Sequence, residues 1–146
     1  MKIIVDSNIL FSSCISPLGD NADLLLNPNY SFEKFSCHYL FVEMFKHQEK
    51  IVRLSKQPLE NVIEVLYSFV RKITFINEEL ISFENWTKAE NLTNDIDNKD
   101  IAFIALTLHI TDSYFWTNDN KLILGLRKKG FNNLISTKEL LQKLKF

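Results

Sequence analysis

The sequence predicts an α/β fold, a three-layer α/β/α sandwich with a central, mostly parallel sheet of about five strands. Short apolar runs alternate with longer amphipathic segments, which is typical of βαβ units. The apolar runs carry few polar residues, as expected for parallel strands that are covered on both faces. No repeat, low-complexity tract or linker divides the chain. Its 146 residues are therefore expected to form one domain, residues 1–146.

The first strand is expected at residues 3–5, where Ile-Ile-Val reads as a fully buried run. Residues 8–13 begin a helix that packs over this strand. Asp20 is expected to cap a short helix at 22–26, which the Asn-Pro-Asn that follows brings to an end. Residues 32–36 predict the second strand.

Two helical segments occupy the middle of the chain. The segment 38–54 predicts one long helix, with an apolar stripe formed by Leu40, Met44, His47, Ile51 and Leu54. Pro58, at a first-turn position, opens another helix, whose apolar face holds Val62, Val65, Leu66, Phe69 and Val70. A third strand is expected at 73–76 and a further helix at 79–92.

The last third of the chain continues the alternation. Its predicted helices and strands span residues 101–108, 114–116, 120–129 and 134–135. Gly130 ends the helix at 120–129, as glycine commonly does after a helix. Ser136 and Glu139 form the capping-box pattern of a final helix.

Composition narrows the class of protein. No segment approaches the ~20 consecutive apolar residues of a membrane span. Asp6 also interrupts the N-terminus where a secretory signal would continue its apolar stretch. Cys14 and Cys37 form neither a disulfide framework nor a zinc set, and two free cysteines suit a reducing compartment. We expect a cytoplasmic protein without membrane association.

Acidic residues end two of the predicted strands. Asp6 follows the first strand and Asp119 lies just past the fourth, in the stretch "SYFWTND". Ligands of open parallel sheets bind outside the carboxyl ends of the strands, so two neighbouring strands would bring both acids together. The alternative for Asp6 is a structural one, since Asp-Ser-Asn is also good turn or helix-cap chemistry.

Further acids lie in the helical segments. At ~100° per residue, Glu43 borders the apolar stripe of its helix instead of facing solvent. Asp95, Asp97 and Asp100 directly precede the apolar helix at 101–108. Capping explains one or two of these acids, with Asp97 as the N-cap and Asp100 in the first turn. Asp100 is also placed to point inward.

Converging carboxylates repel one another, and a divalent cation relieves that repulsion. All-oxygen ligands suit Mg²⁺ or Mn²⁺. Such an ion can lower the pKa of a bound water and stabilise charge on a phosphoryl group. The acids therefore predict a metal-dependent site for phosphate chemistry.

Four stretches in order, "IIVDSNIL", "YLFVEMFKH", "DIDNKDIAFIALTL" and "FWTNDNKL", together resemble a PIN domain, and the likeness extends to the closing "LISTKELL". The resemblance implies a metal-dependent ribonuclease, as in many toxins of type II toxin–antitoxin pairs, and a homodimer. It implies that Asp6, Glu43, Asp100 and Asp119 form the family's acidic quartet and that Asp97 is an additional acid. Thr117 matches the small hydroxyl residue that commonly precedes the last acid.

The expected activity is cleavage of phosphodiester bonds in single-stranded RNA by a metal-activated water. Setting the five candidate acids aside leaves 13 of the 18 acidic residues against 17 basic ones, a mildly positive surface for a phosphate backbone. An aspartyl phosphatase would need a second Asp where Asn8 stands, and no glycine-rich phosphate loop or hydrolase elbow is present. The remaining alternative is a non-catalytic PIN-like module that binds protein or RNA.

Overall fold

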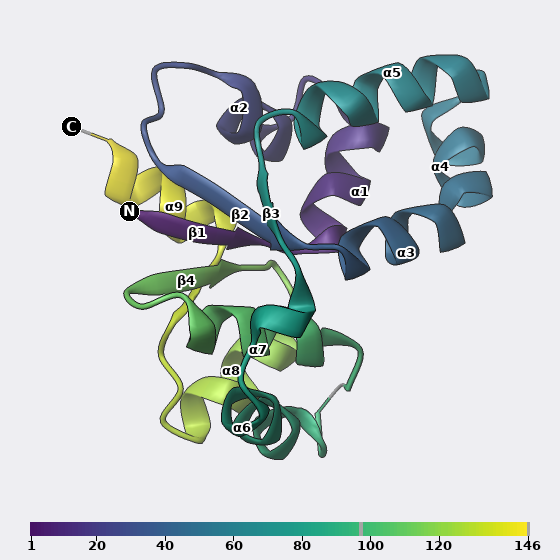
Figure 1. Cartoon of the computed structure of the whole chain (residues 1–146). Helices are drawn as coiled ribbons and strands as arrows, with labels where there is room; N and C mark the ends of the chain where they lie inside the picture. Colours follow the sequence, from purple (N-terminus) through teal and green to yellow (C-terminus); the bar gives the residue numbers. More distant parts are fainter. Residues whose placement is uncertain (97, 146) are drawn as a thin grey trace.

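A five-stranded sheet with the order β3-β2-β1-β4-β5 forms the centre of the fold (Figure 1). The structure is a computed structural model and describes residues 1–96 and 98–145. All four strand pairs are parallel. The strands are β1 Lys2–Val5, β2 Glu33–Cys37, β3 Thr74–Ile76, β4 Ser113–Trp116 and β5 Leu134–Ile135. The predicted α/β class, strand number and parallel sheet are confirmed.

Helices cover both faces of this sheet (Figure 1). In the described residues the α-helices are α1 Ser7–Ile15, α2 Asp20–Leu26, α3 Tyr39–Lys46, α4 Gln48–Ser55, α5 Leu59–Val70, α6 Phe83–Thr93, α7 Ile101–His109, α8 Asn120–Lys128 and α9 Thr137–Leu144. Short 3₁₀ turns span Glu78–Leu80 and Asn98–Asp100. Helix α7 packs on β1, β2 and β4, with α6 against it, whereas α1 contacts α2, α4 and α5 above the opposite face.

The central strand β1 is buried between β2 and β4. Ile3, Ile4 and Val5 have no exposed surface, as the uninterrupted apolar run predicts. Val5 is paired in register with Trp116, the last residue of β4. The residues that follow these two strands, Asp6 and Thr117, therefore leave the sheet side by side.

The apolar contacts beneath this edge come mainly from α7. Its residues from Ala102 to Thr107 are all buried, and the ring of Phe103 stacks on that of Phe115 with centroids 5.7 Å apart. Burial on this scale stabilises each large side chain by roughly 1.5–3 kcal/mol relative to exposure. The core thus holds α7, and the acid at its start, firmly against the sheet.

The prediction of one long helix at 38–54 is wrong. The chain forms α3 and α4, and His47 between them leaves helical geometry at φ −103° and ψ 11°. The bend lets α4 pack on α1 through the buried Ile51, whereas Leu54, expected in the apolar stripe, is 46% exposed. Tertiary packing therefore overrides a periodicity that continues through the bend.

Several predicted helix starts also shift. Gly19, not Asp20, is the N-cap of α2, and Pro58 is the N-cap of α5 instead of a first-turn residue. The helix expected at 79–92 is a 3₁₀ turn followed by α6, because the Ser82 side chain caps α6 by accepting from the Asn85 amide. The capping box of Ser136 and Glu139 is confirmed.

No helix in the described parts of the chain is long and apolar enough to cross a membrane.

Candidate acidic site at the carboxyl edge of the sheet

Asp6 lies directly after β1 and is the N-cap of α1. Its Oδ1 accepts long hydrogen bonds of 3.4 Å from the Asn8 amide and the Ser7 hydroxyl. Its Oδ2 accepts a shorter bond of 2.8 Å from the Thr117 hydroxyl. The residue is 1% exposed. Asp6 is thus both a helix cap and a buried carboxylate at the tip of the central strand.

The environment of Asp6 disfavours its charge. Burial raises the pKa of its carboxyl from 3.8 to about 6, the three hydrogen bonds oppose this rise, and the charge of Asp119 adds to it. Among the described residues, no Lys, Arg or His forms a salt bridge with Asp6. Within residues 1–96 and 98–145, the buried carboxyl of Asp6 therefore has no salt bridge that would offset its burial.

Asp119 reaches the same edge from β4. It is the N-cap of α8, where its Oδ1 accepts from the Leu122 amide at 3.1 Å. Its own amide donates to the Thr117 hydroxyl at 3.2 Å. Thr117 is fully buried and joins the two acids, so Asp6 and Asp119 form a pair at neighbouring strand ends.

Glu43 projects from α3 and is 8% exposed, consistent with its predicted place at the border of the apolar face. Its Oε1 accepts a 2.5 Å hydrogen bond from the Tyr39 hydroxyl, and His47 Nε2 lies 3.5 Å from its Oε2. Tyr39 and His47 stand four residues before and after Glu43, the spacing of neighbours on one helix face. Both side chains therefore hold Glu43 in place.

Asp100 occupies the N-cap position of α7 and is 9% exposed. The charge of Asp100 contributes to the raised pKa of the Tyr39 phenol. The pKa of this phenol is raised from 10 to about 12. The hydrogen bond to Glu43 is the largest cause, followed by burial and by the charges of Glu43 and Asp100. The charges of Glu43 and Asp100 thus both act on the Tyr39 phenol.

The other candidates in the loop before α7 behave differently. Asp97 lies outside the described residues. Asp95 is exposed and forms a salt bridge with Lys129, which lowers the pKa of its carboxyl. This ion pair places Asp95 on the surface, apart from the buried acids.

The donor chemistry of these acids fits a hard divalent cation, since Asp6, Glu43 and Asp100 are buried carboxylates and Asp119 is half-buried. Over residues 1–96 and 98–145, however, no three His, Cys, Asp or Glu side chains form a group that could hold a metal ion. Among the described acids, Thr117 joins Asp6 to Asp119, whereas Tyr39 binds Glu43 and is influenced by the charge of Asp100.

Sequence reasoning missed Tyr39 and His47 as partners of Glu43. An aromatic residue on a helix face reads as core, and His47 fits the apolar stripe. The signal that could have identified them is their spacing of four residues on either side of Glu43, an acid at the border of the apolar face.

The sequence profile of the PIN domain matches residues 4–145. The chain belongs to the PIN domain family. The predicted resemblance to this family is confirmed, and PIN domains are generally nucleases.

A solved structure supports the same fold. A chain in the crystal structure of VapBC2 from Rickettsia felis, bound to a DNA fragment from their promoter, aligns with this PIN domain at a TM-score of 0.63 and 15% sequence identity. The alignment covers 93% of this chain and 97% of that chain. No curated protein sequence matches the chain.

Proposed function

We propose that this PIN domain is a Mg²⁺- or Mn²⁺-dependent endoribonuclease that cleaves single-stranded RNA. The observation that carries the proposal is Asp6, a buried carboxylate with a pKa raised to about 6, beside Asp119 and without a protein cation among the described residues. A helix cap does not require the burial of an uncompensated carboxylate, whereas a bound cation would compensate its charge.

In this proposal Asp6, Glu43, Asp100 and Asp119 hold the metal, with Asp97 as an additional ligand. The bound ion would lower the pKa of a water molecule and offset charge on the scissile phosphate. The protein's own contribution is positional: Thr117 orients Asp6, and Tyr39 and His47 orient Glu43. Buried, oriented carboxylates lose little freedom on binding a cation.

The proposed RNA substrate is supported by basic residues on α3, which carries Glu43, and on α8, which Asp119 caps. Lys46, Lys121 and Lys128 are exposed and available to a phosphate backbone. Arg127 and Lys129 are instead held in ion pairs with Glu139 and Asp95, so we do not assign them to RNA. Unpaired RNA is favoured, because a backbone must bend toward partly buried acids.

The test is cleavage of labelled single-stranded RNA by the purified protein with Mg²⁺, Mn²⁺ or excess chelator. We expect cleavage with either ion and none with chelator, and no cleavage by Asp6→Asn or Glu43→Gln. Glu84→Gln is the matched control, since Glu84 is an exposed acid that pairs with Lys88 on α6. Unchanged cleavage in chelator would contradict the metal-dependent proposal.

The alternative is a non-catalytic PIN-like module that binds protein or RNA. The absence of a three-ligand group among the described residues favours it. It predicts RNA binding that is insensitive to chelator and to Glu43→Gln, without cleavage. The same experiment therefore separates the two functions.

We also propose that the protein is the toxin of a toxin–antitoxin pair, acting in the cytoplasm, where its two free cysteines would remain reduced. The VapBC2 neighbour motivates the antitoxin partner. Apolar side chains on α3 and α5 are unusually exposed, with Phe45 at 73% and Ile63 at 52%, as at surfaces that bind proteins. A homodimer is a further prediction from the family.

Expression of the toxin alone should arrest growth, and co-expression of the product of an adjacent reading frame should relieve the arrest. Phe45→Glu should abolish the relief while leaving RNA cleavage intact. Growth that is unaffected by the active nuclease would contradict the toxin proposal.

A further inference from the structure

One threonine hydroxyl at the start of α9 joins three separate segments of the chain. Thr137 Oγ1 accepts hydrogen bonds from Trp116 Nε1 at 3.0 Å and from Asn118 Nδ2 at 2.8 Å. It donates at 2.6 Å to Asn21 Oδ1 in α2. A hydroxyl offers one donor and two acceptor sites, so these three bonds use its full capacity.

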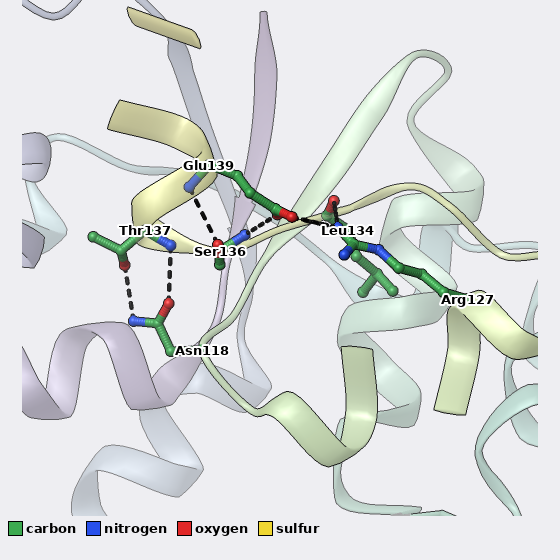
Figure 2. A network of polar contacts seen from close by, with 6 residues as sticks. All are labelled: Asn118, Arg127, Leu134, Ser136, Thr137 and Glu139. Atoms are coloured by element: carbon green, nitrogen blue, oxygen red, sulfur yellow. Dashed lines mark hydrogen bonds and ion pairs between the residues drawn. The ribbon is translucent and has the colours of Figure 1, made fainter. Parts of the chain in front are cut away.

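Thr137 also holds Asn118 through its backbone. The Thr137 amide donates to Asn118 Oδ1 at 2.9 Å, so both polar atoms of the Asn118 amide bond to the same residue (Figure 2). This paired contact fixes the orientation of a side chain that is itself exposed. We call the contact between Asn118 and Thr137 the amide clamp.

The amide clamp holds Asn118, which lies between Thr117 and Asp119 in the loop that follows β4, here called the β4 loop. Thr117 on one side bonds inward to Asp6, and Asp119 on the other side caps α8. The Thr117 amide donates to Ile135 in β5 at 3.1 Å. Asn118 therefore connects this loop to α9, whereas the neighbouring Thr117 connects it to Asp6.

The start of α9, which carries Thr137, is held by further polar contacts. Glu139 accepts from the Ser136 amide at 2.9 Å and from Arg127 at 3.0 Å through both of its oxygens, and Arg127 also reaches the Leu134 carbonyl (Figure 2). Arg127 belongs to α8, the helix that Asp119 caps. Both ends of α8 are thus connected to the start of α9.

We propose that Thr137 and Asn118 are positioning residues of the acidic site, which hold Thr117 and Asp119 at the distance from Asp6 that cleavage requires. The inference rests on the proposed nuclease function. A misplacement of about 1 Å lowers a reaction rate on the order of 10²-fold, and a loop alone does not hold a site that closely. The hydrogen bonds of Thr137 to Asn118 and Asn21 restrict the loop after β4, although none of these residues is one of the acids.

The structural part of the test uses amide hydrogen exchange in the metal-free protein. Asn118→Ala removes the clamp without leaving a buried polar atom unpaired, and Thr137→Val removes the hydroxyl. Both should speed exchange at Thr117, Asp119 and Leu122 by about tenfold or more relative to α5. Thr107→Val is the control, because it removes a buried threonine hydrogen bond within α7. It should change no exchange rate selectively at the β4 loop.

The functional part compares kcat and KM for single-stranded RNA with Mn²⁺. Asn118→Ala and Thr137→Val should each lower kcat on the order of tenfold or more with KM within about twofold, whereas Thr137→Ser, which keeps the hydroxyl, should retain the kcat of the wild type. Wild-type kcat in Asn118→Ala and Thr137→Val, or loss of activity only in proportion to unfolded protein, would overturn the inference while leaving the nuclease proposal intact. A wild-type protein that cleaves no RNA would overturn both.

Discussion

The hydroxyl of Thr117 donates a 2.8 Å hydrogen bond to Oδ2 of Asp6, a residue 111 positions away in the sequence. The bond joins the carboxyl ends of β1 and β4 and lies in a fully buried setting. It favours the ionised form of Asp6, whereas burial of the carboxyl disfavours it. Thr117 thus controls how readily Asp6 carries the charge that a cation needs.

Replacing Thr117 with Val should raise the pKa of Asp6 above its value of about 6, because the favourable hydrogen bond is lost and burial remains. The carboxyl signal of Asp6 in a carbon-13 NMR titration of the metal-free protein measures the change. Thr117→Ser keeps the hydroxyl and should leave the pKa near that of the wild type. A Val variant with an unchanged Asp6 pKa would show that the bond does not form in solution.

Replacing Glu43 with Gln should lower the pKa of Tyr39 from about 12 toward its ordinary value of 10, since the hydrogen bond to Glu43 is the largest cause of the rise. The tyrosinate absorbance during an alkaline titration reports the phenol. Subtracting the titration of Tyr39→Phe isolates it from the other three tyrosines, as the chain has four. Glu49→Gln, at an exposed acid of α4, serves as the control.

Much of this site could be predicted from local sequence. Apolar runs ending in acids placed Asp6 and Asp119 at strand tips, because a buried strand and its polar exit are both local features. The helical angle placed Glu43 near the buried face. Whether β1 and β4 are neighbours is a property of the whole sheet, and it follows from the family resemblance but not from either strand.

The bend at His47 and the role of Tyr39 could not be predicted in the same way. The apolar periodicity continues from Met44 to Ile51, so nothing local marks the end of α3. The break depends on the packing of α4 against α1, which is a tertiary contact. Tyr39 likewise has a tertiary neighbour that its own helix does not reveal, since its ring centroid lies 6.1 Å from that of Phe103 in α7.

Replacing Asp100 with Asn should abolish RNA cleavage with little change in melting temperature. Asp100 stands at the N-cap of α7, and Asn is as good an N-cap residue as Asp, so the loss of about 1 kcal/mol that follows replacement of a cap by Ala is not expected. Asp97→Asn should reduce cleavage more mildly. Cleavage assays and thermal melts of both variants test this, and the reverse order would assign the principal ligand role to Asp97.

Asp6 should destabilise the metal-free protein above pH 6. Its pKa is raised by burial, so the folded state binds this proton more tightly than the unfolded chain does. The stability that it contributes is fully present below pH 3.8 and is lost as the pH rises through about 6. The difference between these two values corresponds to a loss of about 3 kcal/mol.

Asp6→Asn removes the charge and keeps the shape, so it should melt higher than the wild type at pH 7–8 in chelator and nearly equal to it at pH 4. Added Mg²⁺ should stabilise the wild type more than the variant, because weaker binding gives a smaller stabilisation. Asp20→Asn, at an exposed acid in the first turn of α2, should show neither effect. If Asp6→Asn melts lower at every pH and the wild type does not respond to the ion, Asp6 is a helix cap alone, and the metal proposal must be abandoned.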